Sequence, residues 1–272
     1  MTEAVKQIIC IKWGTRFGPD YVNRLRAMIA RNITPPFRLV CFTDDGAGLH
    51  PDVAVRPLPR FDYQAPTNTL GKWPKSRLWG DLGDITGIVL FLDLDVVIVG
   101  NLDDFFTFGD PDDTVLATNP QSVKPFEKLG QTSVYRMRVG KLAPLQEIFR
   151  DDPQGVADEY RFEQRFVTRR APGGVRFWPR GWVVHFRSDC VPPVPLRYWK
   201  EPRIPPGARI VIFAGSLNPP DAIAGRWSDR DQHRAPADHL RAAFDGRRRE
   251  GLGRHLRHYV KPTGWVADLW RE

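Results

Sequence analysis

Two carboxylate side chains stand two positions apart directly after the most apolar stretch of the chain. That stretch is residues 88–92, and Asp93 and Asp95 follow it before a second apolar run starts at Val96. In an extended chain, residues two apart project to the same side, so the spacing predicts that both carboxylates point to one place. A hard divalent cation, Mg²⁺ or Mn²⁺, would relieve their repulsion and could also bind phosphates. The alternative is a polar strand end that caps a turn.

The elements that must position these carboxylates alternate between strand and helix. An unbroken apolar run indicates a strand buried on both faces. We therefore predict an α/β fold with a mostly parallel central sheet flanked by helices, in which ligands bind beyond the carboxyl ends of the strands. The predicted strands are residues 8–12, 38–43, 53–58, 88–92, 115–119, 132–139, 175–178, 182–186 and 209–213. One predicted helix starts at Pro19. Three others span residues 75–82, 142–150 and 158–167.

Length and charge restrict the class of protein. With 272 residues and 42% hydrophobic residues, the chain can form one large domain or two small ones. We expect a main domain at residues 1–223 and a basic, mainly helical extension at residues 224–272 packed on it. That extension has 11 Lys or Arg and 7 Asp or Glu, half of the net charge of +8. Its basic residues lack interleaved aromatic residues, which argues against nucleic-acid binding.

No apolar run reaches the length of a membrane span, and the first seven residues are polar. We therefore expect a cytoplasmic protein, with peripheral contact with a membrane left open. The three cysteines, Cys10, Cys41 and Cys190, are far apart and are expected to be reduced. Near the C-terminus, residues 265–270 are apolar at helical spacing and are expected to dock onto the core.

Three consecutive motifs resemble those of a known enzyme family. They are Lys75-Ser76-Arg77-Leu78, then Asp93-Leu94-Asp95, then Asn101-Leu102-Asp103-Asp104-Phe105. The chain resembles the retaining glycosyltransferases of the glycogenin and bacterial lipopolysaccharide galactosyltransferase type, glycosyltransferase family 8-like, which have a GT-A fold. A looser similarity extends to about Gly215 and so covers roughly three quarters of the sequence.

The resemblance implies a metal-dependent hexosyltransferase that moves a sugar from a UDP-sugar donor to a saccharide or other hydroxyl acceptor. Asp93 and Asp95 would hold Mn²⁺ or Mg²⁺ against the diphosphate of the donor. The remaining site residues implied are Trp13, Gly14 and Thr15 at the uracil and ribose, Arg77 at the phosphate or sugar, Glu163 and Gln164 beside the anomeric carbon, and Gly215 at the diphosphate.

The sequence also departs from the family pattern. Residues 212–219 lack the histidine that serves as the third metal ligand, and Asn218 stands where a phosphate-binding lysine is expected. Water or His185 could complete the metal site. The acceptor segment is altered to Gln131-Thr132-Ser133. The aromatic and charged residues around Trp199 could line an acceptor groove or form a packed loop.

Other classes of protein stay open at this stage. A protein of the same fold could bind a sugar nucleotide with weakened catalysis. An apolar strand followed by Asp-Leu-Asp also occurs in haloacid-dehalogenase phosphatases, and Gly14-Thr15-Arg16 is similar to part of the sugar-nucleotide pyrophosphorylase motif. Activity towards an aryl phosphate would identify the phosphatase, and binding of UDP without turnover would identify the binding protein.

Overall fold

The computed structural model describes residues 5–67, 72–120, 127–244 and 250–272. The chain divides into two compact units. The first comprises Met1–Leu94 and Asn101–Arg180, and the second comprises Asp95–Gly100 and Gly181–Glu272. This division differs from the expected boundary at residue 223. The second unit starts earlier because the short strand β5 (Val97–Ile98) pairs with β10 (Ile210–Ile212), which joins residues 95–100 to the C-terminal part of the chain.

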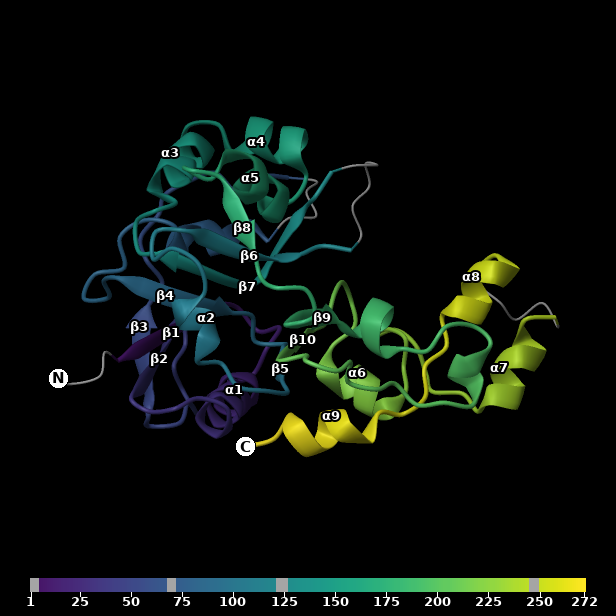
Figure 1. Ribbon diagram of the computed structural model, residues 1–272. Helices are drawn as coiled ribbons and strands as arrows, with labels where there is room; N and C mark the ends of the chain where they lie inside the picture. The colour runs from purple at the N-terminus through teal and green to yellow at the C-terminus, as the bar shows by residue number, and fades with distance from the viewer. Residues whose placement is uncertain (1–4, 68–71, 121–126, 245–249) are drawn as a thin grey trace. The chain divides into compact units, whose positions relative to one another are not determined.

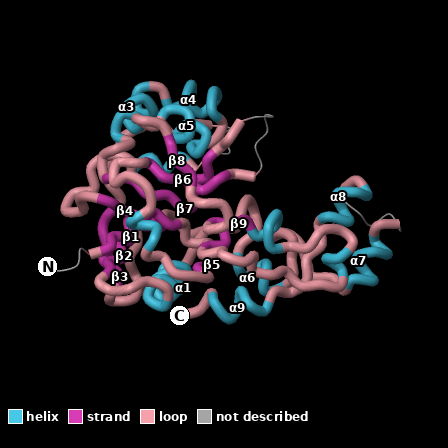
Figure 2. Tube along the Cα trace, viewed as in Figure 1, coloured by secondary structure: helices cyan, strands magenta, loops and turns pink. Residues whose placement is uncertain are grey.

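The first unit is built on a seven-stranded sheet of order β3-β2-β1-β4-β7-β6-β8 (Figures 1 and 2). Four of its strand pairs are parallel, and β7 pairs antiparallel with both β4 and β6. The expected mostly parallel central sheet is thus confirmed. The strands are β1 (Lys6–Lys12), β2 (Phe37–Thr43), β3 (Val53–Pro57), β4 (Ile88–Leu92), β6 (Thr114–Thr118), β7 (Gly130–Arg138) and β8 (Val175–Phe177).

Helices of the first unit pack on this sheet. The helix α1 (Pro19–Arg31) buries Val22, Leu25 and Met28, the apolar face that its sequence predicts. The helix α5 (Glu163–Arg170) contacts β7, and α4 (Pro153–Tyr160) contacts both α5 and α3 (Ala143–Asp151). The first unit also contains α2 (Asp104–Thr107) and the 3₁₀ helix η1 (Trp73–Leu78).

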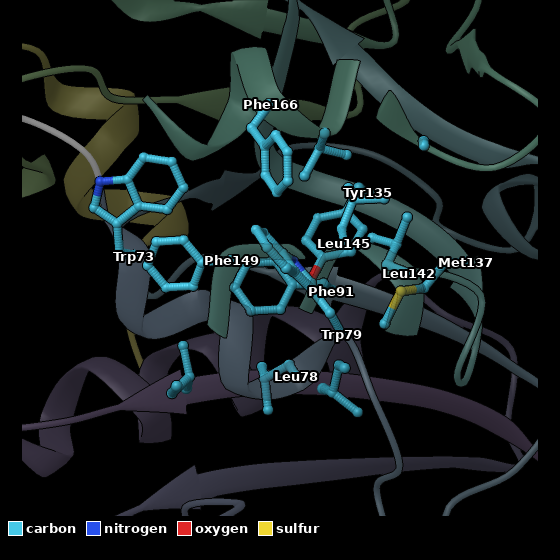
Figure 3. Close-up of a cluster of buried hydrophobic side chains, with 14 of the residues drawn as sticks. Trp73, Leu78, Trp79, Phe91, Tyr135, Met137, Leu142, Leu145, Phe149 and Phe166 are labelled. Atoms are coloured by element: carbon cyan, nitrogen blue, oxygen red, sulfur yellow. The ribbon is translucent and has the colours of Figure 1, made fainter. Parts of the chain in front are cut away.

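A cluster of buried aromatic side chains joins these elements (Figure 3). Trp73 of η1 stacks on Phe149 of α3 with ring centroids 4.6 Å apart, and Phe91 of β4 stacks on Tyr135 of β7 at 4.8 Å. Such rings each bury a large apolar area. They fix η1 against α3 and β4 against β7, beside the part of the fold that carries the predicted site.

Two of the sequence-based predictions are wrong in detail. The helix expected at residues 158–167 is two helices, because Arg161 has a φ of +63° and interrupts the helical backbone before α5 begins. The strand expected to be half-exposed, β7, is buried on both faces except at its ends. Its Arg136 is accommodated because the guanidinium donates to the carbonyl oxygens of Phe108 at 2.5 Å and Asp110 at 2.6 Å.

The second unit contains a three-stranded sheet of order β5-β10-β9, in which β9 is Val183–His185. The helix α9 (Gly264–Leu269) contacts β5 and α6 (Pro219–Ala224), and Val266 and Trp270 are buried. The C-terminal residues therefore dock within this unit, as predicted. Its remaining helices are η2 (Phe186–Cys190), η3 (Leu196–Tyr198), α7 (Pro236–Ala242) and α8 (Leu252–Arg257). In the described parts of both units, none of the helices combines the length and the apolar character that a membrane span needs.

Histidine and tyrosine rings hold α7 and α8 together. His239 stacks on His255 with ring centroids 4.1 Å apart, and its Nδ1 lies 3.1 Å from the hydroxyl of Tyr198. Tyr198 in turn stacks on Tyr259 at 4.6 Å. Burial, with a smaller contribution from His255, lowers the pKa of His239 to about 4.

This shift predicts a loss of stability in mild acid. Between about pH 6.5 and pH 4 the unfolded chain binds a proton at His239 that the folded chain does not, so stability falls as the pH decreases through this window. We expect the free energy of unfolding to fall by about 2 kcal/mol from this residue between pH 7 and pH 5. Urea unfolding of wild type and His239→Gln at both pH values checks this. An equal loss in the variant would assign the pH dependence to other groups.

Candidate functional site

The carboxyl ends of β1, β2 and β4 meet at one edge of the first unit's sheet. These strands are parallel, with Ile9 opposite both Val40 and Phe91. Trp13 therefore follows β1 at the same edge at which Asp93 follows β4. In open α/β sheets, this edge is where ligands bind.

Asp93 forms a close ion pair at this edge. The ammonium group of Lys75 lies 2.7 Å from its Oδ1 and 2.8 Å from its Oδ2. The Lys75 side chain is 7% exposed and the Asp93 side chain 20%, so the lysine is covered while the carboxylate reaches the surface. Lys75 Nζ also lies 3.4 Å from the carbonyl oxygen of Thr132 and 5.2 Å from the centre of the Phe91 ring. One accessible carboxylate is thus held in a fixed orientation.

Arg77, the basic residue that the family resemblance places in the site, has a different environment. Its guanidinium donates to the carbonyl oxygen of Pro59 at 2.9 Å and lies 5.7 Å from the centre of the Tyr63 ring. Lys75 and Arg77 are two positions apart in the 3₁₀ helix η1, where residues three apart share a face. The two side chains therefore leave the helix in different directions. Lys75 of the Lys75-Ser76-Arg77-Leu78 motif therefore contacts Asp93, and Arg77 contacts Pro59.

A second carboxylate, Glu163, is buried at the start of α5. Its Oε2 accepts a hydrogen bond from the backbone N–H of Lys72 at 2.8 Å, and its Oε1 accepts one from the Thr132 hydroxyl at 3.2 Å. The side chain is 4% exposed. Of the predicted pair, Glu163 therefore points into the protein, while Gln164 is half-buried.

Tyr135 connects the surroundings of Asp93 and Glu163. Burial, and then the nearby charges of Asp93 and Glu163, raise the pKa of its phenol well above the ordinary value. Its hydroxyl is buried and has no hydrogen-bond partner among the described residues. A buried, unpaired hydroxyl is costly.

The loop after β1 has the backbone that a ligand-binding turn needs. Gly14 has a φ of +61°, and a Cβ atom there would meet no atom within 4 Å. Its backbone N–H donates to Oδ2 of Asp44, which lowers the pKa of that carboxyl. Trp13 is half-buried against the aromatic core, and Thr15 is exposed. The three predicted loop residues thus lie at the same edge as Asp93, with Asp44 fixing the turn.

Asp95 belongs to the second unit and is half-buried. The strand β4 ends at Leu92, and residues 94 and 95 form a turn. The sequence-based prediction that the two carboxylates point to one place assumed an extended backbone at residues 93–95. The backbone at residues 94 and 95 is a turn instead. Leu94 and Val96, on either side of Asp95, are 3% and 0% exposed.

Gly215 follows β10 within the second unit. Its φ is +76°, and a Cβ atom there would meet only Nη1 of Arg187, at 3.6 Å. Arg187 donates to the carbonyl oxygens of Ala214 at 3.2 Å and Trp227 at 2.5 Å. A basic group thus lies beside the glycine predicted to contact a diphosphate. His185, the suggested alternative metal ligand, lies in β9 opposite Ile212 and is 6% exposed.

The described side chains around Asp93 do not complete a site for a divalent cation. Among the described residues, no group of three or more His, Cys, Asp or Glu side chains is placed to hold a metal ion. Both oxygens of Asp93 already contact the Lys75 ammonium, so a cation on this carboxylate would lie within a few ångströms of a positive charge. The arrangement around Asp93 does not fit a tight metal site.

Comparison with solved structures identifies the fold. The galactosyltransferase LgtC in complex with donor and acceptor sugar analogues matches with a TM-score of 0.53 and 13% identity over 97% of this chain and 100% of that one. An active-site mutant of LgtC matches with a TM-score of 0.53 and 12% identity, over 87% of this chain and 95% of that one. The glycosyltransferase GlyE of Streptococcus pneumoniae TIGR4 matches with a TM-score of 0.53 and 10% identity, over 98% of this chain and 65% of that one.

No protein-family model and no curated protein matches the sequence. At these identities the structural matches establish the fold, which is the glycosyltransferase fold that the sequence motifs predict.

Proposed function

We propose that the chain transfers a hexose from a UDP-sugar to a hydroxyl group of a saccharide acceptor, with retention of configuration. The observation that carries the proposal is the accessible Asp93 carboxylate, oriented by Lys75 beside the loop after β1 in a fold shared with glycosyltransferases. One of these neighbours was crystallised with donor and acceptor sugar analogues.

In this proposal the first unit binds the nucleoside part of the donor. Trp13, Gly14 and Thr15 contact the uracil and ribose, and Asp93 accepts hydrogen bonds from donor hydroxyl groups. A carboxylate paired with one ammonium group keeps lone pairs for such bonds. Lys75 is the positioning residue that holds the carboxylate. Gly215 is proposed to contact the diphosphate through its backbone, which suits a residue without a Cβ atom.

Transfer also requires a group beside the anomeric carbon. Gln164 is proposed for this place because it is half-buried, whereas both oxygens of Glu163 already accept hydrogen bonds. Glu163 would position α5 and, through Thr132, the strand β7. Retention could use a carboxylate nucleophile, but the bonded state of Glu163 favours attack on the same face as the departing diphosphate. Arg77 is proposed to support the loop that carries Pro59 and Tyr63 near the donor.

The function is tested by titrating UDP and then measuring hydrolysis and transfer from UDP-glucose and UDP-galactose. We expect saturable UDP binding and slow hydrolysis that accelerates with an acceptor saccharide. UDP binding without release of sugar from either donor would favour the catalytically weakened binding protein. Hydrolysis of an aryl phosphate in place of the sugar donors would contradict the proposal in favour of the phosphatase.

Metal dependence, which the resemblance implies, is proposed in a weak form. A doubly charged cation about 5 Å from an ammonium group is repelled by on the order of 2 kcal/mol even at the dielectric constant of water. We therefore expect Mn²⁺ to bind with millimolar affinity, and Lys75→Met to bind it at least tenfold more tightly. Electron paramagnetic resonance of free Mn²⁺ measures this without turnover.

Arg77→Met is the matched control for this measurement, because Arg77 is two residues away on the same short helix and contacts Pro59 rather than Asp93. Its Mn²⁺ affinity should equal that of wild type. Micromolar binding by the wild-type protein would show that Lys75 does not oppose the cation.

A further inference from the structure

The second unit contains a pocket lined by Trp199 and its neighbours, apart in sequence from the residues proposed to bind the donor. Its volume is about 520 Å³, which is within the range of small-ligand sites. The lining residues come from one continuous segment and from the region of α9: Trp199, Lys200, Glu201, Pro202, Arg203, Ile204, Lys261 and Trp265. Two indole rings and four charged side chains thus share one concave surface.

Trp199 presents its ring to solvent from a fixed backbone. Its side chain is 67% exposed, an unusual state for a large apolar group. Its N–H donates to Leu196, and its carbonyl oxygen accepts from Lys261 Nζ at 3.3 Å. The neighbouring Tyr198 is 3% exposed and lies edge-on to the indole at 6.3 Å. The ring is therefore held out over a rigid support, with area available for a ligand.

The rest of the pocket wall is also fixed. Trp265 donates its indole N–H to the carbonyl oxygen of Pro202 at 3.0 Å, and the N–H of Arg203 bonds to the carbonyl oxygen of Cys190 at 3.0 Å. A wall that is ordered before binding reduces the entropy lost on binding. The pocket has the construction of a binding site rather than of a loose surface loop.

The side chains that line the pocket indicate what kind of ligand it can bind. The face of an indole ring is electron-rich, so it attracts the weakly positive C–H groups on the flat face of a sugar ring. The lining has three basic residues, Lys200, Arg203 and Lys261, against one acidic residue, Glu201. A guanidinium group binds carboxylate or phosphate in a bidentate manner. The indole ring of Trp199 can therefore stack on the face of a sugar, and the basic side chains can bind a negative group attached to that sugar.

We propose that this pocket binds an anionic saccharide, one that carries a carboxylate or a phosphate group. The sugar ring stacks on Trp199, and the negative group contacts Arg203 and the two lysines. The identification of this saccharide as part of the acceptor rests on the proposed function. The binding of the saccharide to the pocket is independent of that function. The pocket would then select acidic or phosphorylated acceptors.

The test is calorimetric titration of the full chain with glucuronic acid, glucose 6-phosphate, glucose and inorganic phosphate. We expect both anionic sugars to saturate the protein and to bind at least fivefold more tightly than glucose or phosphate alone. Trp199→Ala should weaken their binding at least fivefold. Phe244→Ala is the matched control, since Phe244 is an aromatic residue of the same unit that is 77% exposed and outside the pocket. It should bind as wild type does.

Lys261→Gln provides a second, conservative variant. It should lower affinity for both anionic sugars and leave that for glucose unchanged. Equal binding of phosphate and glucose 6-phosphate, or undiminished binding by Trp199→Ala, would overturn the proposal. The proposal would also be overturned if the protein bound neither anionic sugar but bound anionic lipid vesicles, and if Trp199→Ala lost that vesicle binding. Hydrolysis of UDP-sugars, measured in parallel, tests the proposed function separately from saccharide binding.

Discussion

Asp93→Asn is expected to reduce sugar transfer at least 100-fold. The substitution keeps the shape of the side chain but removes the charge that pairs with Lys75 and an acceptor for donor hydroxyl groups. Because Lys75 is 5% exposed, the variant removes the negative charge of Asp93 from beside a nearly buried ammonium group. We expect this to cost about 3 kcal/mol of stability, or a decrease in Tm of roughly 6–12 °C. Activity at saturating donor and thermal unfolding measure the two effects.

A double variant separates the role of Asp93 in stability from its role in function. In Asp93→Asn with Lys75→Met, no buried charge is left unpaired, so stability should return to within about 1 kcal/mol of wild type. Activity should remain at least 100-fold low because the carboxylate is still missing. Recovery of activity together with stability would mean that Asp93 acts only through folding.

Glu163 and Gln164 are expected to respond in opposite ways to substitution by alanine. Glu163→Ala removes the acceptor of the Lys72 N–H and of the Thr132 hydroxyl. The buried Thr132 hydroxyl and the part-buried Lys72 N–H then lose their partner, which should cost about 3 kcal/mol. Gln164→Ala should leave Tm within about 1 °C, since substitutions outside the core and its networks have small effects, and should lower kcat at least tenfold.

Thermal unfolding and steady-state kinetics on both variants check this contrast. Glu163→Gln is the control, because it retains the side-chain volume and one carbonyl acceptor and should recover most of the stability. A stable Glu163→Ala protein with kcat reduced 100-fold would instead assign the chemistry to Glu163.

The sequence alone determined the sheet and the position of the acidic pair. The apolar run at residues 88–92 forms β4 as predicted, and the alternation of strands and helices before it gives the parallel order of β1, β2, β3 and β4. These features depend on local patterns of hydrophobicity, which each segment carries in its own residues. The docking of Val266 and Trp270 followed from the same kind of pattern.

The tertiary structure decided how the side chains around the strand end are used. Lys75 rather than Arg77 reaches Asp93, and Glu163 rather than Gln164 points inward, to a backbone group 91 residues earlier in the chain. The division into units depends on β5 pairing with β10, more than a hundred residues later. Each outcome is set by contacts between segments distant in sequence, whose partners a local pattern of residue types does not specify.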